Sequence, residues 1–302
     1  MFFRNLQVYQ LTAPFTHSSE RLEELLSERF FQPCSGLTTH RLGWFPPLGA
    51  ASEQLIHVTN GRMMLCMKRQ ERLLPSSVIR ESVEEKVEAI AHKEGRTLSR
   101  NEKSRIKEEV IVDLLPRAFT RSTLTYLFID PESGWLIVDS SSATKAEEVL
   151  MLLRDTVGSL KIRPLTVKGD PAALLTRWLN GETPAEVVMA NECELVESGE
   201  KKGVVRMRGV DLEGDEVVQH LQSGKLVSKL ALVWQERISC VVGSDLSFRR
   251  FKLTDTVMEE SADVAAEDAA LRFDADFALM ALELSRFLPH FCDYFGGLAE
   301  TE

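Results

Sequence analysis

The sequence predicts an α+β fold, a class in which strands and helices follow one another without a regular strand–helix–strand order. Three observations predict it. Short alternating or β-branched runs typical of strands recur from the first third of the chain to the last. A charge-dense stretch at 76–115 has the apolar spacing of helices, and a long amphipathic or buried helix is expected at 274–295.

The N-terminal elements are a strand at about 3–11 and a helix near 18–30, for which Ser18 is a suitable N-cap. Two prolines and two glycines predict a turn-rich connection through "HRLGWFPPLGA" (40–50). The next stretch, "RMMLCMKRQ" (62–70), is predicted to be a strand with a basic end.

Residues 76–115 predict two helices that form a charged hairpin projecting from the body. Gly95 and the capping box of Ser99 and Glu102 divide the stretch, and Pro116 ends or kinks the second helix. The hairpin has little apolar surface of its own. Two strands, 122–129 and 134–140, follow it.

The next helix is expected to begin at a capping box of Thr144 and Glu147 and to end near Gly158. After a mixed stretch at 165–200, a short helix at 213–224 is expected between the first two of four strands. These strands are predicted at 203–210, 225–235, 237–243 and 247–253. The expected domains are a central α+β region (1–75 and 120–165), a projecting tip (76–119) and a second α+β region with acidic C-terminal helices (166–302).

The composition predicts a globular cytoplasmic protein. Of 302 residues, 44% are hydrophobic and 27% are charged, and no apolar run approaches the ~20 residues that span a bilayer. The opening "MFFRNLQVYQLT" has none of the features of a signal peptide. The five cysteines are odd in number and form no C-x-x-C pair, which predicts buried free thiols in a reducing compartment. They are Cys34, Cys66, Cys193, Cys240 and Cys292.

The net charge of −10 is concentrated at the C-terminal end. Residues 255–302 contain twelve carboxylates and two arginines, so residues 1–254 sum to zero. Salt screens exposed charges over about 8 Å, so an acidic end does not cancel a basic surface elsewhere. The acidity therefore does not exclude nucleic-acid binding.

A basic stripe is predicted on the second helix of the hairpin. Between Lys93 and Lys107 six cations face two glutamates. Four cations are spaced by four, three and four residues, which places them on one face of a continuous helix: Arg96, Arg100, Lys103 and Lys107. Such a stripe can follow a DNA backbone without reading bases, whereas a solvated helix face with ion pairs is the alternative.

A phenylalanine between two arginines follows the hairpin in "LLPRAFTR" (114–121). An exposed aromatic side chain with arginine neighbours is typical of an interface anchor. The alternative is a core residue whose neighbours point outward. The candidates are Arg117, Phe119 and Arg121.

Signals for catalysis are few. Asp274 and Asp276 form a D-x-D that could ligate a metal, but acids at a helix start also favour the helix dipole. The chain has no phosphate-binding loop, dinucleotide fingerprint or nucleophile elbow. We therefore expect no enzyme activity, no cofactor and no metal site.

Nine stretches carry a family resemblance, occur in order and cover nearly the whole chain. They are "NLQVYQLT" (5–12), "GWFPPLG" (43–49), "HVTNG" (57–61), "ERLLPSSVIR" (71–80), "LLPRAF" (114–119), "LIVDSSSATKAEEVL" (136–150), "GSLKIRPL" (158–165), "SGKLVSKLAL" (223–232) and "RFDADFALM" (272–280). As a set they resemble the bacterial recombination-associated RdgC family.

The resemblance implies a non-enzymatic DNA-binding protein of the cytoplasm, associated with the nucleoid. The family forms a head-to-head, tail-to-tail homodimer of curved protomers that closes into a ring with a basic channel for duplex DNA. Its members bind single- and double-stranded DNA with little sequence preference and limit strand exchange by RecA. They are also linked to replication-fork recovery. No membrane partner is implied.

The resemblance also assigns residues. Phe119 matches the aromatic that docks across one dimer contact, the gate of the ring, and Arg117 matches a channel arginine beside it. Arg96 matches a basic hairpin position implicated in DNA contact. Lys225 and Lys229, in the landmark at 223–232, are included among the DNA-binding candidates.

At the second dimer contact, Arg208 keeps a charge that family members carry, but Gly209 and Val210 depart from the family pattern. The predicted function is a sequence-nonspecific DNA-binding ring that limits RecA-mediated recombination. One alternative is a protein–protein module that caps RecA or a replication factor, with DNA binding secondary. A third is a metal-dependent nuclease that uses Asp274 and Asp276.

Overall fold

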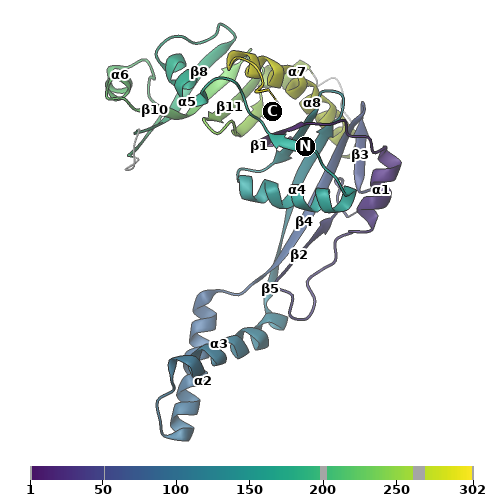
Figure 1. The fold of residues 1–302 in the computed structure, drawn as a ribbon, viewed down its shortest axis with the longest axis vertical. Coiled ribbons are helices and arrows are strands. Elements are labelled where there is room, and N and C mark those ends of the chain that lie inside the picture. The colour runs from purple at the N-terminus through teal and green to yellow at the C-terminus, as the bar shows by residue number, and fades with distance from the viewer. Residues whose placement is uncertain (1, 51, 198–202, 261–268, 301–302) are drawn as a thin grey trace.

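One antiparallel sheet of twelve strands runs through the protein, and helices pack against it in both halves, so the fold is α+β as predicted (Figure 1). The structure is a computed structural model that describes residues 2–50, 52–197, 203–260 and 269–300. The strand order is β2-β4-β5-β6-β1-β12-β11-β10-β8-β9, with β3 beside β4 and β7 beside β1. Both α+β regions expected from the sequence therefore share a single sheet.

The N-terminal half of the sheet has a core covered by two helices, α1 (Ser19–Ser27) and α4 (Ala143–Val157). Their apolar faces, with Leu22 and Leu150 fully buried, pack on the sheet around Trp44. The strands of this half are β1 (Leu6–Leu11), β2 (His40–Trp44), β3 (Ile56–Thr59), β4 (Arg62–Leu73), β5 (Phe119–Asp130) and β6 (Trp135–Asp139).

A two-stranded ribbon extends from this half of the sheet. β4 and β5 pair over their whole length, from Met63 opposite Ile129 to Leu73 opposite Phe119. Figure 1 shows the ribbon leaving the body and carrying two helices at its far end.

These two helices are α2 (Ser76–Glu94) and α3 (Arg100–Leu114), followed by the short turn η1 (Leu115–Arg117). They pack on each other through a small cluster centred on Ile106 and Val110. The predicted division into two helices is confirmed. Gly95 ends α2 in the left-handed conformation, and Ser99 and Glu102 form both hydrogen bonds of the capping box.

The C-terminal half of the sheet is covered on one face by α5 (Pro171–Leu179) and α8 (Ala269–Tyr294). Phe248 from the sheet packs against Phe287 and Phe291 of α8 in the larger core. The short strand β7 (Ile162–Pro164) pairs with β1 of the first half. The other elements of the C-terminal half are β8 (Val187–Val196), β9 (Val204–Arg208), α6 (Asp215–Gln222), β10 (Leu226–Trp234), β11 (Ile238–Gly243), β12 (Phe248–Leu253) and α7 (Asp255–Glu260). Part of the acidic segment at 255–302 lies outside the described residues.

Two local predictions are wrong. The stretch at 40–50 was expected to be a turn-rich connection, but it begins with strand β2. Position 43 of that strand is a glycine because a Cβ atom there would come within 2.6 Å of the Phe31 backbone. The N-cap of α4 is Ser142 rather than Thr144, since the Ser142 hydroxyl accepts the hydrogen bond from the backbone of Lys145.

The cysteine prediction is confirmed for four of the five residues. Cys66, Cys193, Cys240 and Cys292 are buried free thiols, whereas Cys34 is half-buried. Among the described residues, no helix combines the length and the apolar character needed to cross a membrane.

Candidate nucleic-acid interface

The basic stripe is present on α3, where Arg100, Lys103 and Lys107 are exposed. No ion pair joins any of these three side chains to another residue in the part of the chain that the structure describes. The alternative of a solvated helix face neutralised by ion pairs therefore does not fit these three positions. Their charge is available to a polyanion.

Arg96 does not belong to this helix face, which corrects the prediction of a four-residue stripe. It lies in the connection between α2 and α3, because the left-handed Gly95 ends α2 before it. Its guanidinium forms ion pairs with Glu94 at 2.8 Å and with Glu102 at 2.5 Å. Hydrogen bonds from Arg96 and from Ser99 lower the pKa of Glu102 to about 2. Arg96 thus links the end of α2 to the first turn of α3 through these two ion pairs.

The end of the β4–β5 ribbon presents an apolar surface. Phe119, the first residue of β5, is 84% exposed, and its cross-strand partner Leu73 is 42% exposed. The core alternative for Phe119 is therefore wrong. Arg117 beside it is exposed, whereas Arg121 forms an ion pair with Glu71 at 2.5 Å. An exposed phenylalanine at the start of a strand has the character of an interface anchor.

The remaining predicted residues lie on the C-terminal half of the sheet. Lys225, half-buried just before β10, is 3.6 Å from Glu197. Lys229 on β10 forms an ion pair with Glu194 at 2.7 Å, and Arg208 on β9 forms one with Glu192 at 3.2 Å. Both pairs lie in one depression, on the face of the sheet opposite the helix-covered core.

We call this depression the sheet hollow. It has a volume of about 870 Å³. Its lining has five cations and two carboxylates, a surplus of three positive charges. The lining residues are Asn5, Glu192, Cys193, Glu194, Arg206, Arg208, Lys229, Val241, Arg249 and Arg250.

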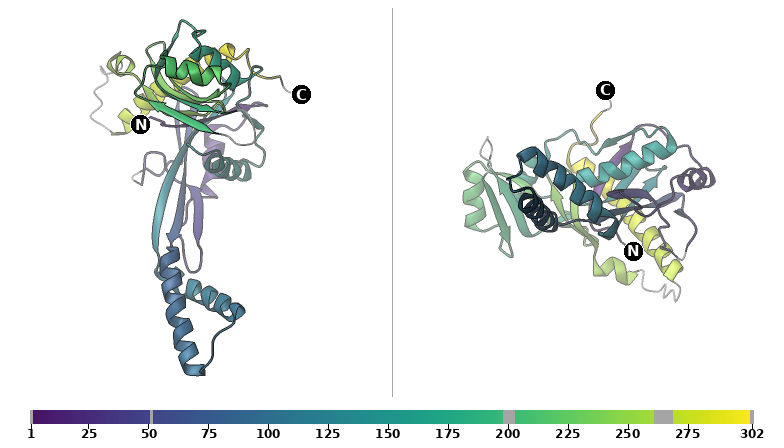
Figure 2. Two further views of the ribbon diagram at one scale, coloured as in Figure 1. Left: turned by 90° about the vertical axis from the view of Figure 1, so that its left-hand side faces the viewer. Right: turned by 90° about the horizontal axis from the view of Figure 1, so that it is seen from below.

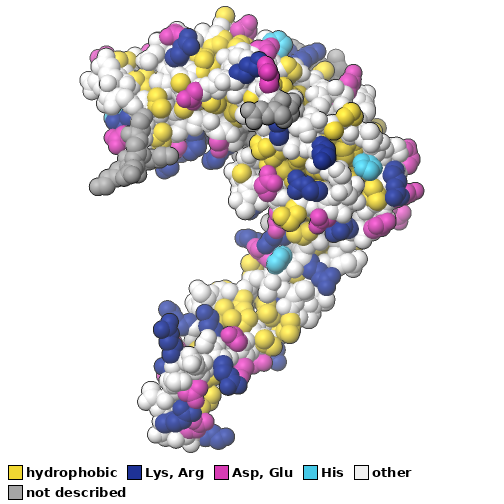
Figure 3. All heavy atoms as spheres, in the orientation of Figure 1, with side chains coloured by type: hydrophobic (Ala, Val, Ile, Leu, Met, Phe, Trp, Pro, Cys, Tyr) yellow, Lys and Arg dark blue, Asp and Glu magenta, His cyan; other side chains and the backbone are white. Residues whose placement is uncertain are grey.

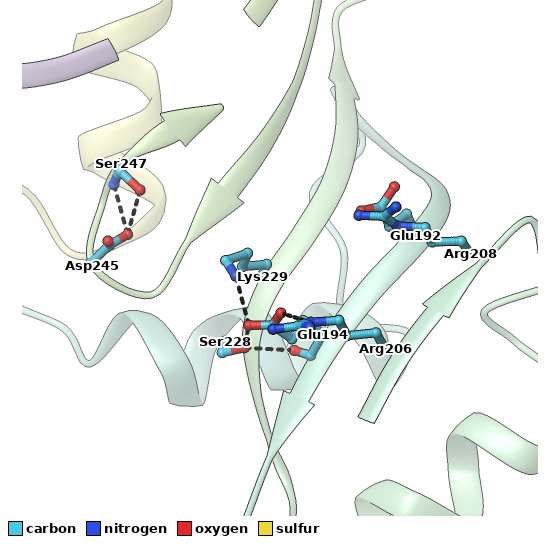
Figure 4. A network of polar contacts seen from close by, with 8 residues as sticks. All are labelled: Glu192, Glu194, Arg206, Arg208, Ser228, Lys229, Asp245 and Ser247. Carbon is cyan, nitrogen blue, oxygen red and sulfur yellow. Dashed lines mark hydrogen bonds and ion pairs between the residues drawn. The ribbon is translucent and has the colours of Figure 1, made fainter. Parts of the chain in front are cut away.

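Glu194 is the most heavily bonded residue of the sheet hollow. Figure 4 shows Lys229, Arg206 and Ser228 converging on its carboxylate. Burial alone would raise the pKa of Glu194, but the hydrogen bonds from these three side chains outweigh it and lower the pKa to about 2. Glu194 is therefore charged across the physiological pH range and holds two cations in place.

Sequence reasoning missed three cations of the sheet hollow: Arg206, Arg249 and Arg250. The available signal was the adjacent pair in "SFRRFKL" (247–253), which was assigned only to a strand. Strict alternation would place neighbouring side chains on opposite faces of the sheet. The structure places both arginines on the same face.

The D-x-D lies beyond the first turn of α8, so the expectation that these acids mark a helix start is wrong, and Asp274 has a structural partner. The Asp274 carboxylate accepts a hydrogen bond from the Thr59 hydroxyl and contacts His57 Nε2 at 2.9 Å, which ties α8 to β3. Asp276 also has an interaction in the structure. Within the described ranges, no group of three or more His, Cys, Asp or Glu side chains is placed to hold a metal ion.

The two basic surfaces lie on the two arms of a hook. The upper arm is the C-terminal half of the sheet with α5 to α8, and the lower arm is the β4–β5 ribbon with α2 and α3 (Figure 1). Lys and Arg side chains lie on the underside of the upper arm and, mixed with Asp and Glu side chains, on the hairpin (Figure 3). The strands of the upper arm are directly visible from below (Figure 2, right). The hook therefore carries cations on both sides of its open space.

Comparison with known proteins identifies the family. The family model described as "Putative exonuclease, RdgC" matches residues 1–298. The chain belongs to the RdgC family. It is 42% identical over 298 residues to the recombination-associated protein RdgC of Tolumonas auensis, covering 98% of this chain and 99% of the relative.

Two further relatives carry the same name. The recombination-associated protein RdgC of Psychromonas ingrahamii is 41% identical over 298 residues, which cover 98% of this chain and 99% of the relative. That of Yersinia pestis is 40% identical over 301 residues, which cover 99% of each chain. The resemblance recognised in the sequence is thus confirmed. These relatives are named for recombination, whereas the family model is described as an exonuclease.

Proposed function

We propose that this RdgC-family protein binds DNA without sequence preference, encloses the duplex in a dimeric ring and thereby limits RecA-mediated recombination. The observation that carries the proposal is that the sheet hollow and the exposed cations of α3 lie on the two arms of one hook (Figure 1). A duplex presents one negative charge per about 1.7 Å of axis, so cations on two sides of an open space suit a charged cylinder better than a small ligand.

Each of the two arms supplies a contact for a second copy of the chain. Phe119 is exposed where the ribbon reaches the hairpin, and β9 is the last strand of the sheet at the other end. A twofold axis makes each contact self-complementary, so joining two hooks at both ends closes a ring. In the proposed dimer Phe119 anchors the gate, and Arg208 lies near the second contact.

The mechanism needs no chemistry and no cofactor. Exposed cations such as Lys103 contact backbone phosphates individually and weakly, and each contact releases counterions. Enclosure turns these weak contacts into long residence, because DNA leaves only by sliding off an end or by gate opening. A recombinase that must polymerise along the same DNA is then blocked at the nucleoid.

The test compares two DNA substrates of unrelated sequence, a linear fragment and a covalently closed circle. We expect affinity for both to fall steeply with salt, by a slope near −0.9 for each phosphate neutralised. After a high-salt challenge, complexes on the circle should outlast those on the linear fragment. A shallow salt dependence, or no binding at physiological salt, would overturn the proposal.

The exonuclease description of the family model keeps one other candidate in view, a nuclease that uses the D-x-D of Asp274 and Asp276. End-labelled duplex should remain intact after long incubation with the protein and Mg²⁺ or Mn²⁺. Progressive shortening that Asp274→Asn and Asp276→Asn abolish would establish the nuclease instead.

A further inference from the structure

Two β-bulges build the sheet hollow. The first lies on β12, where the pairing shifts between Ser239 opposite Lys252 and Val241 opposite Arg249, so β12 contains one extra residue. Arg250 lies at this bulge and has φ +50°, in the left-handed region. Phe248 and Phe251 on either side remain in the core, and the two arginines between them both line the hollow.

The second bulge lies on β10, opposite Glu194. The pairing shifts from Val227 opposite Leu195 to Lys229 opposite Glu194, which again inserts one residue. Ser228 and Lys229 consequently both reach the Glu194 carboxylate, at 2.9 Å and 2.7 Å (Figure 4). Without the bulges, one member of each adjacent pair would point into the core.

Four of the five cations in the hollow are fixed in pairs on its two carboxylates. Glu194 bridges Arg206 and Lys229, each at 2.7 Å. Glu192 bridges Arg208 and Arg250, at 3.2 Å and 2.7 Å. Each carboxylate neutralises one of its two cations, so one positive charge remains in each group. A guanidinium that donates one hydrogen bond to a carboxylate also keeps further N–H donors for a ligand. The cations are thus held in place without being neutralised.

The fifth cation has an unused donor. The Nε atom of Arg249 is buried and has no hydrogen-bond partner in the described structure. A buried donor without an acceptor costs about 1–3 kcal/mol, and Arg249 is not committed to any acceptor among the described residues, so a ligand in the hollow can engage its guanidinium. Asp245 is not that acceptor, because its carboxylate is bonded to the backbone and hydroxyl of Ser247 (Figure 4).

We infer that the sheet hollow is a site for a backbone phosphate of DNA, with Arg249 and Arg250 as its principal ligands. The inference rests on the proposed function and adds a specific phosphate contact to it. A phosphodiester brings a negative charge and acceptor oxygens that match the planar fork of a guanidinium. The surplus of three positive charges favours an anion, and the hollow opens on the sheet face opposite the helix-covered core.

The test measures the salt dependence of affinity for one duplex of unrelated sequence in four proteins: the unmodified protein, Arg249→Met, Arg250→Gly and Lys252→Met. Lys252 is the matched control, since it lies on the same strand, is exposed beside Asp255 and does not line the hollow. Glycine tolerates φ +50°, so Arg250→Gly removes the charge without straining the bulge, and its melting temperature should stay close to that of the unmodified protein because the ion pair lost with Glu192 is partly exposed.

We expect Arg249→Met and Arg250→Gly each to reduce the magnitude of the slope of log K against log salt by about 0.9, and affinity several-fold, beyond any change in Lys252→Met. Equal changes in all three variants, or none, would overturn the phosphate site while the proposed function stands. So would a polyglutamate peptide whose binding requires Arg249 while the duplex slope is unchanged, which would assign the hollow to an acidic protein partner. Absence of duplex binding by the unmodified protein would overturn both.

Discussion

Glu194 is a single side chain on which the geometry of the sheet hollow depends. Its carboxylate accepts bonds from Arg206 on β9 and from Ser228 and Lys229 on β10, so it joins three adjacent strands of the sheet. These bonds lower its pKa to about 2, against the effect of burial, and keep it ionised where the cations need a counter-charge. Charge-assisted hydrogen bonds of this kind stabilise more than neutral ones.

The pH dependence of stability should therefore change in Glu194→Gln. The folded-state pKa lies below the ordinary value of 4.5, so the ionised carboxylate stabilises the fold above pH ~4.5 and this contribution is lost as the pH falls toward about 2. We expect Glu194→Gln to lower the free energy of unfolding by about 1–2 kcal/mol at pH 7, with a difference that shrinks below pH ~4.5. Thermal unfolding at pH 7 and pH 3 measures it.

The control is Glu197→Gln, because Glu197 is half-exposed and lies 3.6 Å from Lys225. This variant should differ little from the unmodified protein at either pH. A Glu194→Gln penalty that is as large at pH 3 as at pH 7 would mean that Glu194 acts through packing rather than through its charge.

For some single residues the local sequence predicts the wrong environment, because that environment depends on tertiary contacts. The sequence correctly predicted that Arg249 and Arg250 lie in a strand. Both side chains point to the same face because of a bulge, and the hydrophobic periodicity of the sequence does not predict that bulge. Gly43 was interpreted as a turn signal because the close approach of the Phe31 backbone, twelve residues earlier, is a tertiary contact. Phe119 shows the reverse case, since its charged neighbours and boundary position did indicate exposure.

At the scale of elements, the hairpin of α2 and α3 is stabilised locally. Its cluster has only three buried residues, Leu98, Ile106 and Val110, and the Ser99 capping box and Arg96 hold the connection. Local signals sufficed to predict both helices, because caps and left-handed glycines act within a few residues. The β2 strand was missed because its support comes from pairing with β4.

Charge reversal of the stripe, Lys103→Glu with Lys107→Glu, tests the element without unfolding it. Both side chains are exposed and bond to no described carboxylate, so the free energy of unfolding should change by less than about 1 kcal/mol. Duplex affinity should fall at least tenfold, since phosphate contacts become repulsive. Inhibition of RecA strand exchange should fall in parallel, and fluorescence anisotropy with a strand-exchange assay measures both.

The control double variant is Lys161→Glu with Lys168→Glu, which makes the same change in net charge outside both the hairpin and the sheet hollow. Its DNA affinity should fall less. If RecA inhibition survives in the hairpin variant while DNA binding is lost, the protein acts by capping RecA or another partner, and the DNA-occlusion mechanism is wrong.

At the scale of the molecule, one continuous sheet joins the two arms of the hook. β1 lies between β6 of the first half and β12 of the second, so both arms extend from one hydrogen-bonded framework. Neither the shared sheet nor the placement of the two basic surfaces could be predicted from local patterns, because strand order is set by long-range pairing. The acidic segment at 255–302 includes α8, which packs on the sheet face opposite the hollow. The basic and acidic surfaces are thus separated by the sheet itself.

The last prediction concerns the closed ring. Phe119 is 84% exposed in the protomer, so Phe119→Ala should change its free energy of unfolding by less than about 0.5 kcal/mol. An aromatic anchor at the centre of an interface contributes about 2 kcal/mol or more, so self-association should weaken at least tenfold. Retention on closed circular DNA after a salt challenge should then fall to that on linear DNA, while the initial salt slope is preserved. Sedimentation and the circle assay measure these effects.

The control is Val188→Ala, which truncates a 59% exposed side chain on β8 and should leave both self-association and retention on the circle unchanged. Equal losses of thermal stability and DNA affinity in Phe119→Ala would instead make Phe119 a folding residue, because a gate residue affects the release of DNA and leaves the phosphate contacts intact.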